Sequence, residues 1–253
     1  VNKEGELDSE MNQQIREQMN HDPATVPGRI KQYLEQKDNI QLNVAITGES
    51  GSGKTSFVNV FRGIENSDQR AAPVGIKETT KKVNSYPHPN YPNVTLWDLP
   101  GIGTVKRKRD TYEKETGFEK FDFFIIISDT HRRANDVQLA KMIQEKRKRF
   151  YFVHSKIDQT LRNESRNDRN FTAETTLALT SEKCIQGLQE QGFMQPQVFL
   201  VSNFEPDQHD FPRLRETFNR ELDDLKKHAL LCTVATMHLE VINRKKKDYQ
   251  AGI

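Results

Sequence analysis

A glycine-rich segment near the start of the chain has the composition and spacing of a phosphate-binding loop. Gly48 to Thr55 read GESGSGKT and fit the pattern GxxxxGK[ST]. In this pattern, glycines let successive backbone N–H groups turn inward around phosphate oxygens, and the following helix adds the positive end of its dipole. We expect Lys54 to reach the terminal phosphates and the Thr55 hydroxyl to ligate Mg²⁺. The predicted phosphate contacts are Gly48, Glu49, Ser50, Gly51, Ser52, Gly53, Lys54, Thr55 and Ser56.

A turn that only caps a helix is the alternative interpretation of this segment. The apolar run LNVAIT precedes it and the helical pattern KTSFVNVF follows it. This is the strand and helix context that a phosphate-binding loop requires. The context therefore favours phosphate binding.

Asp98 and Gly101 belong to a second segment, DLPG, which directly follows the apolar run NVTLW. The carboxylate is expected to reach Mg²⁺ through a water molecule, and the Gly101 N–H to sense the terminal phosphate. The next position often carries a glutamine that aligns the attacking water, but here it is Ile102. Hydrolysis therefore needs another group to orient the water.

The identity of the base follows from a third segment, SKID, which begins at Ser155. The aspartate of this motif accepts hydrogen bonds from both the ring N–H and the exocyclic amine of guanine, while the lysine stem lies over the base. Adenine lacks that donor pair and would leave the charge of Asp158 unpaired. We therefore expect a guanine nucleotide held by Lys156 and Asp158, with Ser155 bracing the phosphate-binding loop and Ser202 and Asn203 beside the guanine carbonyl.

Short apolar runs alternate with helical patterns through the middle of the chain, which is typical of a parallel sheet covered by helices. The runs predict strands over residues 42–47, 93–98, 121–127, 150–155 and 197–202. The helical patterns predict helices over residues 54–62, 134–147, 173–190 and 210–224. Each of the three motifs then follows a strand, at the edge where open α/β sheets bind ligands.

The composition argues against several other classes of protein. The chain has 253 residues, of which 29% are charged and 34% hydrophobic, and its formal net charge is only +2. This balance gives no electrostatic field that would indicate nucleic acid binding. No apolar run is long enough to span a membrane. Cys184 and Cys232 lack the spacing of metal ligands, so we expect reduced thiols in the cytoplasm.

The two ends of the chain differ from its middle. Residues 1–38 are polar, with apolar residues at helical spacing near their end. Residues 225–253 have the pattern of an amphipathic helix whose apolar stripe needs a partner. We therefore expect an N-terminal helical segment at 1–38, a nucleotide-binding domain at 39–224 and the start of a C-terminal helical segment at 225–253.

The chain resembles the immunity-related GTPases, which are interferon-inducible proteins of vertebrate innate immunity. The resemblance rests on NVAITGESGSGKTSFVNVFRG, AAPVGIKETT, YPNVTLWDLPGIGT, FDFFIIIS and FYFVHSKID, and it runs from about residue 40 to 222. It implies a P-loop Ras-like G domain, an α/β fold with a mostly parallel six-stranded sheet and helices on both faces. It also implies a longer C-terminal helical region, so we expect the chain to be truncated there.

The same resemblance implies ligands, partners and a place of action. Family members bind GTP and GDP with Mg²⁺ and self-assemble through the nucleotide face in the GTP-bound form. They act at intracellular membranes such as those of pathogen vacuoles. We therefore expect a cytoplasmic protein that associates peripherally with such membranes, forms dimers or oligomers and contacts related GTPases.

The segment KETT lies where a GTPase places a mobile segment that closes over the terminal phosphate. The resemblance assigns Thr80 as the switch threonine that completes the Mg²⁺ site with Thr55 and Asp98. Glu78 is the best candidate to orient the water, and Lys54 joins these two as a catalytic residue through its phosphate contact. A carboxylate adds negative charge, so we expect slow basal turnover that a second subunit accelerates. A surface residue on a loop is the alternative interpretation of Glu78.

Two functions stay open at this point. The first is a slow GTPase whose turnover rises when GTP-bound subunits pair. The second is a regulatory module that binds guanine nucleotides, hydrolyses little and acts as a switch. The intact Lys54, Thr55, Asp98 and Thr80 favour the enzyme, whereas Ile102 favours the switch.

Overall fold

A computed structural model of the chain describes residues 40–75, 82–102, 109–130 and 134–229. The chain separates into the units Val1–Ile40 and Gln41–Ile253, and the described residues belong almost entirely to the second. Most of the two predicted end segments, together with Glu78 and Thr80, lies outside the described residues. The division into three segments and the roles of these two residues therefore stay predictions.

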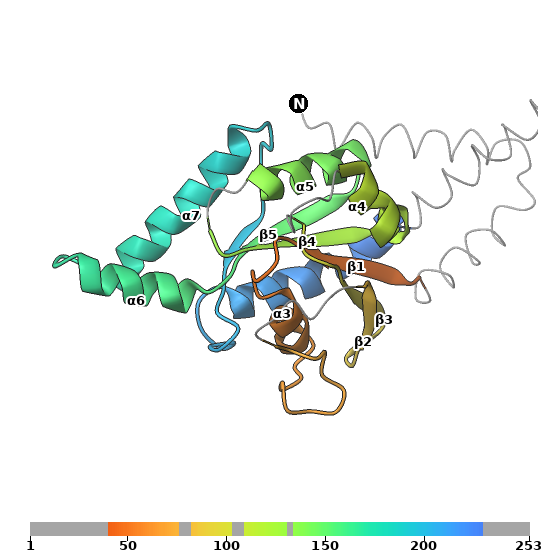
Figure 1. Cartoon of the computed structure of the whole chain (residues 1–253), viewed down its shortest axis with the longest axis horizontal. Helices are drawn as coiled ribbons and strands as arrows, with labels where there is room; N and C mark the ends of the chain where they lie inside the picture. Colours follow the sequence, from red (N-terminus) through yellow and green to blue (C-terminus); the bar gives the residue numbers. More distant parts are fainter. Residues whose placement is uncertain (1–39, 76–81, 103–108, 131–133, 230–253) are drawn as a thin grey trace, which may run out of the picture. The chain divides into compact units, whose positions relative to one another are not determined.

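The fold is built on one six-stranded sheet with the strand order β2-β3-β1-β4-β5-β6 (Figure 1). All neighbouring strands are parallel except β2 and β3, which are antiparallel. The prediction of an α/β fold with a mostly parallel six-stranded sheet is confirmed. The strands are β1 (Leu42–Thr47), β2 (Asn84–His88), β3 (Tyr91–Asp98), β4 (Phe123–Ser128), β5 (Arg149–His154) and β6 (Val198–Leu200).

The edge strand β2 is the one strand that the apolar pattern did not predict. Its sequence NSYPH is mostly polar, and only His88 is buried. Pro87 cannot donate a backbone hydrogen bond, and it is tolerated because β2 lies at the edge of the sheet. The register with β3 also shifts between Pro87 and His88. A short, polar, irregular strand of this kind has no periodicity to detect.

Helices connect the strands, and among the described residues two α-helices and one short 3₁₀ helix were not predicted from the sequence. Both α4 and α6 are dominated by polar and charged residues, RDTYEKET and IDQTLRNESRN. In α6 only Ile157 and Leu161, four residues apart, pack against the core, and so short an apolar stripe is easily overlooked. The last described helix runs without interruption over residues 211 to 229. The helices are α3 (Lys54–Phe61), α4 (Arg109–Thr116), the short 3₁₀ helix η2 (Phe118–Lys120), α5 (Ala134–Glu145), α6 (Ile157–Asn167) and α7 (Ala173–Gln189).

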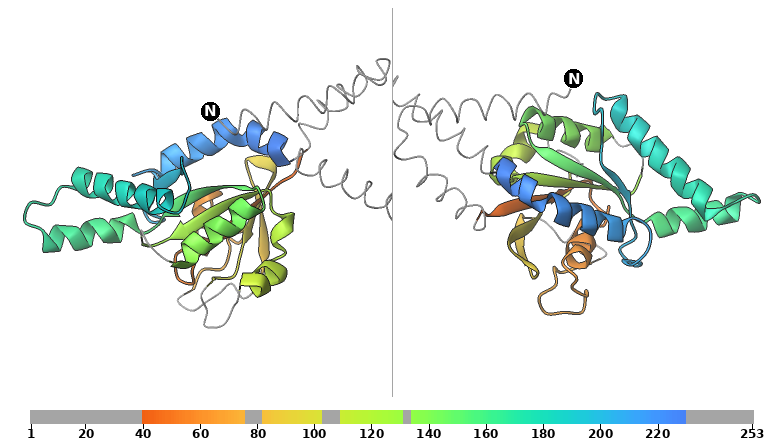
Figure 2. Two further views of the ribbon diagram at one scale, coloured as in Figure 1. Left: turned by 90° about the horizontal axis from the view of Figure 1, so that it is seen from above. Right: turned by 180° about the vertical axis from the view of Figure 1, so that it is seen from behind.

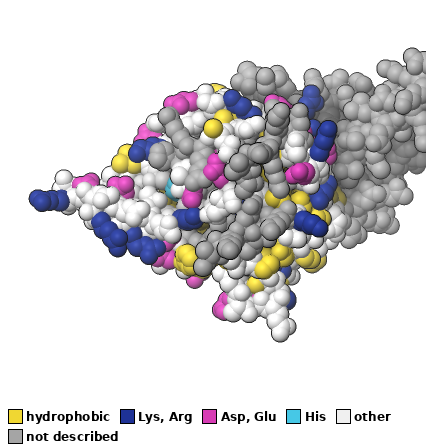
Figure 3. Space-filling model, in the orientation of Figure 1, with side chains coloured by type: hydrophobic (Ala, Val, Ile, Leu, Met, Phe, Trp, Pro, Cys, Tyr) yellow, Lys and Arg dark blue, Asp and Glu magenta, His cyan; other side chains and the backbone are white. Residues whose placement is uncertain are grey.

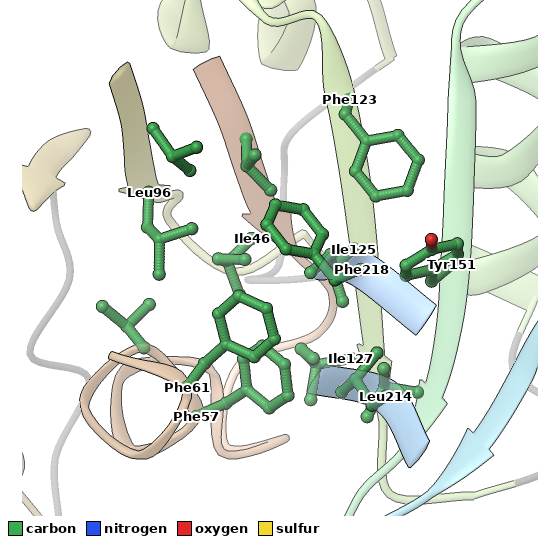
Figure 4. Close-up of a cluster of buried hydrophobic side chains, with 14 of the residues drawn as sticks. Ile46, Phe57, Phe61, Leu96, Phe123, Ile125, Ile127, Tyr151, Leu214 and Phe218 are labelled. Carbon is green, nitrogen blue, oxygen red and sulfur yellow. The ribbon is translucent and has the colours of Figure 1, made fainter. Parts of the chain in front are cut away.

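Hydrophobic packing covers both faces of the sheet. On one face, Phe57 and Phe61 of α3 and Leu214 and Phe218 of the 211–229 helix pack against strand side chains (Figure 4). On the other face, α4, α5 and α7 cover the sheet. Figure 2 shows the 211–229 helix and α5 on opposite sides of the strands. The prediction of helices on both faces is therefore confirmed.

The thiol of Cys184, which is buried in this core, is expected to be unreactive. Cys184 of α7 is 1% exposed, and burial raises its pKa to about 12. A thiol with so high a pKa carries almost no thiolate at neutral pH and is a poor nucleophile or metal ligand. This agrees with the expected reduced core thiol, whereas Cys232 lies outside the described residues.

Candidate nucleotide-binding site

The phosphate-binding loop joins the end of β1 to the first residue of α3, Lys54. Its turns use positive φ angles at Gly48, Gly51 and Gly53, of 138°, 80° and 92°. A Cβ atom at Gly48 would lie 2.1 Å from the backbone oxygen of Ile127. Only glycine therefore fits at the point where the chain leaves β1, and the loop follows a path that side chains would forbid.

Lys54 is held against this loop. Its side chain is largely buried, with the residue 6% exposed, and Nζ donates a hydrogen bond of 2.7 Å to the backbone oxygen of Glu49. Two residues before Lys54 in the loop, the hydroxyl oxygen of Ser52 is buried and has no hydrogen-bond partner in the part of the chain that the structure describes. Buried polar atoms are nearly always paired in proteins, so the loop offers an ammonium group and an unpaired hydroxyl for a ligand.

The two described candidates for Mg²⁺ ligation are in direct contact. The Thr55 hydroxyl donates a hydrogen bond of 2.7 Å to Oδ2 of Asp98, because Asp98 ends β3 beside the loop and pairs in register with Ile46 of β1. A hydroxyl and a carboxylate are oxygen ligands of the kind that Mg²⁺ prefers, with waters and substrate phosphates completing its shell. The residues present therefore fit the ion.

The DLPG segment lies along the phosphate-binding loop. Leu99 donates a backbone hydrogen bond to Ile46 at 3.0 Å, and Ile102 donates one to Gly48 at 3.1 Å. A Cβ atom at Gly101 would lie 2.6 Å from the backbone nitrogen of Ser50. The predicted phosphate sensor is thus packed directly against the predicted phosphate-binding loop.

Ile102 is a core residue, with 3% of its surface exposed. Replacing it with glutamine is expected to lower the free energy of unfolding by about 1–3 kcal/mol, because the amide is buried without a designed partner. The same change is expected to leave the rate of GTP hydrolysis unchanged or lower. Ile102→Val should cost only about 0.5–1.5 kcal/mol. Urea denaturation and phosphate release check both effects; faster hydrolysis by a fully stable Ile102→Gln protein would contradict them.

The SKID motif begins directly after β5 and contacts the phosphate-binding loop. The Ser155 hydroxyl donates to the backbone oxygen of Ser52 at 2.7 Å, which confirms the predicted brace. Lys156 has a left-handed backbone with φ 57°, and its Nζ donates to the backbone oxygen of Gly51 at 2.7 Å and to Asp129 at 3.0 Å. The predicted base and phosphate motifs therefore form one hydrogen-bonded unit.

Besides the Ser52 hydroxyl, two side-chain oxygen atoms near the SKID motif and β6 are buried with no hydrogen-bond partner among the described residues. One is Oδ1 of Asp158, a residue that is 6% exposed at the start of α6. The other is Oδ1 of Asn203, whose amide nitrogen donates to the backbone oxygen of Gly53 at 3.1 Å. The Ser202 hydroxyl beside it accepts from the backbone N–H of Phe204 at 3.2 Å.

Asp129 and Arg162 were not predicted as site residues. Asp129 contacts Lys156, and Nη2 of Arg162 donates to Oδ2 of Asp158. Asp129 follows the apolar run FDFFIIIS, and Arg162 stands four residues after Asp158. The second spacing was a usable signal, because residues four apart are neighbours on a helix.

The fold and the ordered phosphate, DLPG and SKID motifs define a P-loop G domain. Residues 9–253 match the family described as Interferon-inducible GTPase (IIGP). The chain therefore belongs to the interferon-inducible GTPase family, as the resemblance predicted.

Curated relatives agree with this family. Interferon-gamma-inducible GTPase 10 of Mus musculus is 42% identical over 206 residues, which are 81% of this chain and 49% of that protein. T-cell-specific guanine nucleotide triphosphate-binding protein 2 of Mus musculus is 41% identical over 88% of this chain and 54% of its own length. Interferon-inducible GTPase 5 of Rattus norvegicus is 39% identical over 89% of this chain and 49% of its own length. The chain spans about half the length of the curated relatives it matches.

Solved structures share the fold at much lower identity. Toc33 from Arabidopsis thaliana in complex with Mg²⁺ and GMPPNP has a TM-score of 0.51 and 16% identity, covering 77% of this chain and 88% of that chain. The bacterial selenocysteine-specific elongation factor EF-Sec has a TM-score of 0.51 and 15% identity, covering 73% of this chain and 29% of that chain. In the part of this chain that the structure describes, no helix has the length and hydropathy needed to cross a membrane.

Proposed function

We propose that the protein binds GTP and GDP with Mg²⁺ and hydrolyses GTP slowly, with turnover that rises on GTP-dependent self-assembly. The observation that carries guanine binding is Oδ1 of Asp158, which is buried and has no hydrogen-bond partner within the described ranges. It lies in the motif that is hydrogen-bonded to the phosphate-binding loop through Ser155 and Lys156. A buried carboxylate oxygen without a partner is costly unless a ligand supplies a donor, and guanine supplies two.

The phosphate-binding loop accounts for nucleotide binding in this proposal. The N-terminus of α3 and the inward-turned N–H groups of the loop attract phosphate oxygens, and Lys54 exchanges its contact with the Glu49 carbonyl for a phosphate oxygen. Thr55 and Asp98 hold Mg²⁺, which when bound neutralises charge on the phosphates. Gly101 reports the terminal phosphate, because it is packed against Ser50 of the loop.

Hydrolysis is expected to be slow because residue 102 is not a glutamine and another residue must orient the attacking water. Ile102 is buried and apolar, so it cannot do so. Glu78 takes this role and Thr80 completes the Mg²⁺ site, both as predictions from the sequence. Phosphoryl transfer depends on positioning and charge neutralisation, and a carboxylate supplies only the first. Charge stabilisation then comes from a second subunit across the nucleotide face.

The relatives' names support a role in interferon-induced immunity. We propose that the protein acts in the cytoplasm, associates peripherally with intracellular or vacuolar membranes and pairs with itself and related GTPases. A guanine nucleotide switch that hydrolyses little is the second candidate function, and the buried Ile102 in place of glutamine is the observation that favours it.

Phosphate release over a series of protein concentrations tests the proposed enzyme. The rate per subunit is expected to rise with concentration at saturating GTP, because pairing supplies the missing charge stabilisation. Lys54→Ala is the control and should abolish release at every concentration. Turnover that is absent despite micromolar GTP binding would favour the switch, and a rate per subunit that stays constant would exclude activation by assembly.

A further inference from the structure

Arg162 lies one helical turn after Asp158 on α6. Its Nη2 donates to Oδ2 of Asp158, and its Nε donates to the backbone oxygen of the same residue at 3.2 Å. The Asp158 side chain is 5% exposed, whereas that of Arg162 is 63% exposed. Arg162 therefore reaches a buried carboxylate from the solvent side. Figure 3 shows Lys and Arg side chains gathered at the surface of this part of the molecule.

The contact leaves the carboxylate able to bind a base. Arg162 is the one side chain among the described residues that donates a hydrogen bond to it, and the bond goes to Oδ2. Oδ1 is buried and accepts no hydrogen bond from any residue that the structure describes. An ionised carboxylate can accept about four hydrogen bonds. The Asp158 carboxylate can therefore still accept one hydrogen bond at Oδ2 and two at Oδ1 from a bound base.

Guanine recognition needs the carboxylate in one orientation. Its ring N–H and 2-amino group lie in one plane, so both carboxylate oxygens must lie near that plane to accept from them. The terminal torsion of an aspartate side chain is broad, so the backbone alone does not fix this orientation. A guanidinium group has a rigid planar arrangement of donors, and here it contacts both the carboxylate and the backbone of Asp158.

We propose that Arg162 is a positioning residue for base recognition, which fixes the plane of the Asp158 carboxylate so that both oxygens face guanine. The proposal rests on the proposed guanine nucleotide site and names a residue that sets its specificity. The alternative is an ordinary ion pair that stabilises α6, worth about 0.2–0.5 kcal/mol. An ordinary pair would affect every nucleotide equally.

The test compares GDP with IDP, which lacks the 2-amino group, by equilibrium titration. In Arg162→Ala, GDP affinity is expected to fall about tenfold and IDP affinity about twofold or less, because a rotating carboxylate still meets one donor but seldom two. Arg162→Lys should restore part of the preference for GDP, since it returns the charge without the planar donors. Arg166→Ala, an exposed arginine one turn further along α6, is the matched control and should keep the wild-type ratio.

The outcomes separate this proposal from the proposed function. Equal loss of GDP and IDP affinity in Arg162→Ala would overturn the positioning role and leave the guanine site intact. Tighter GDP binding would overturn it too, since Arg162 would then compete with the base. A wild-type protein that binds neither nucleotide would overturn the guanine site and the positioning role together.

Discussion

Asp158→Asn is expected to reverse the base preference of the protein from guanine to xanthine. The substitution replaces one acceptor oxygen with an N–H donor, which clashes with the 2-amino group of guanine and pairs with the 2-oxo group of xanthine. Losing a hydrogen bond to a charged group costs about 1.5–3 kcal/mol, so GDP affinity should fall about 10- to 150-fold. XDP affinity should rise over the wild type. Titration with both nucleotides measures the change.

The control for this experiment is an aspartate that is not part of the site. Asp224 lies on the 211–229 helix, where its exposed side chain pairs with Lys227 at 3.1 Å. Asp224→Asn should leave GDP and XDP affinities at wild-type values. If Asp158→Asn retained wild-type GDP affinity, the assignment of Asp158 to the base would be wrong.

Gly48→Ala is expected to cause the largest loss of stability in the phosphate-binding loop. Its φ of 138° is a conformation that only glycine adopts readily, and the added Cβ would lie 2.1 Å from the backbone oxygen of Ile127. Strain and overpacking together should lower the free energy of unfolding by about 2–4 kcal/mol. GDP binding should be lost, because the loop cannot keep its path. Urea denaturation and GDP titration measure the two effects.

Gly51→Ala is the matched control in the same loop. Gly51 has a φ of 80°, but a Cβ atom there would meet nothing within 4 Å. Gly51→Ala should therefore lower the free energy of unfolding by only about 1–2 kcal/mol, the cost of the left-handed backbone conformation for alanine. Equal destabilisation by the two substitutions would show that the contact with Ile127 does not determine the loop.

The motifs were predictable because each is a local pattern beside an apolar strand. The strands β1, β3, β4 and β5 have strong apolar runs, and the chain enters the phosphate, DLPG and SKID motifs directly after three of them. The order of the strands then brings the motifs to one edge of the sheet. The contacts of Ser155 with Ser52 and of Thr55 with Asp98 follow from that arrangement.

Several elements and contacts could not be predicted from local apolar patterns in the sequence. β2 and α4 consist mainly of polar residues, so neither the strand period nor the helix period distinguishes them. α6 has two apolar residues at helical spacing, Ile157 and Leu161, which are too few to stand out among its polar residues. Asp129 reaches Lys156 across the sheet edge, a contact that depends on strand order and not on spacing. The sequence shows that residue 102 is not a glutamine. Its burial depends on a core cluster that also includes residues of α4 and α5, which the sequence pattern does not reveal.

The two edges of the described sheet limit how copies of this protein can join. An exposed edge strand offers unpaired backbone groups to another chain, but β2 has Pro87 and an irregular register, and β6 has only 3 residues. Neither edge can extend the sheet into a neighbouring molecule over a useful length. The proposed pairing of subunits is therefore expected to use side chains and not these two edges, which also give little opportunity for the strand-to-strand growth that produces fibrils.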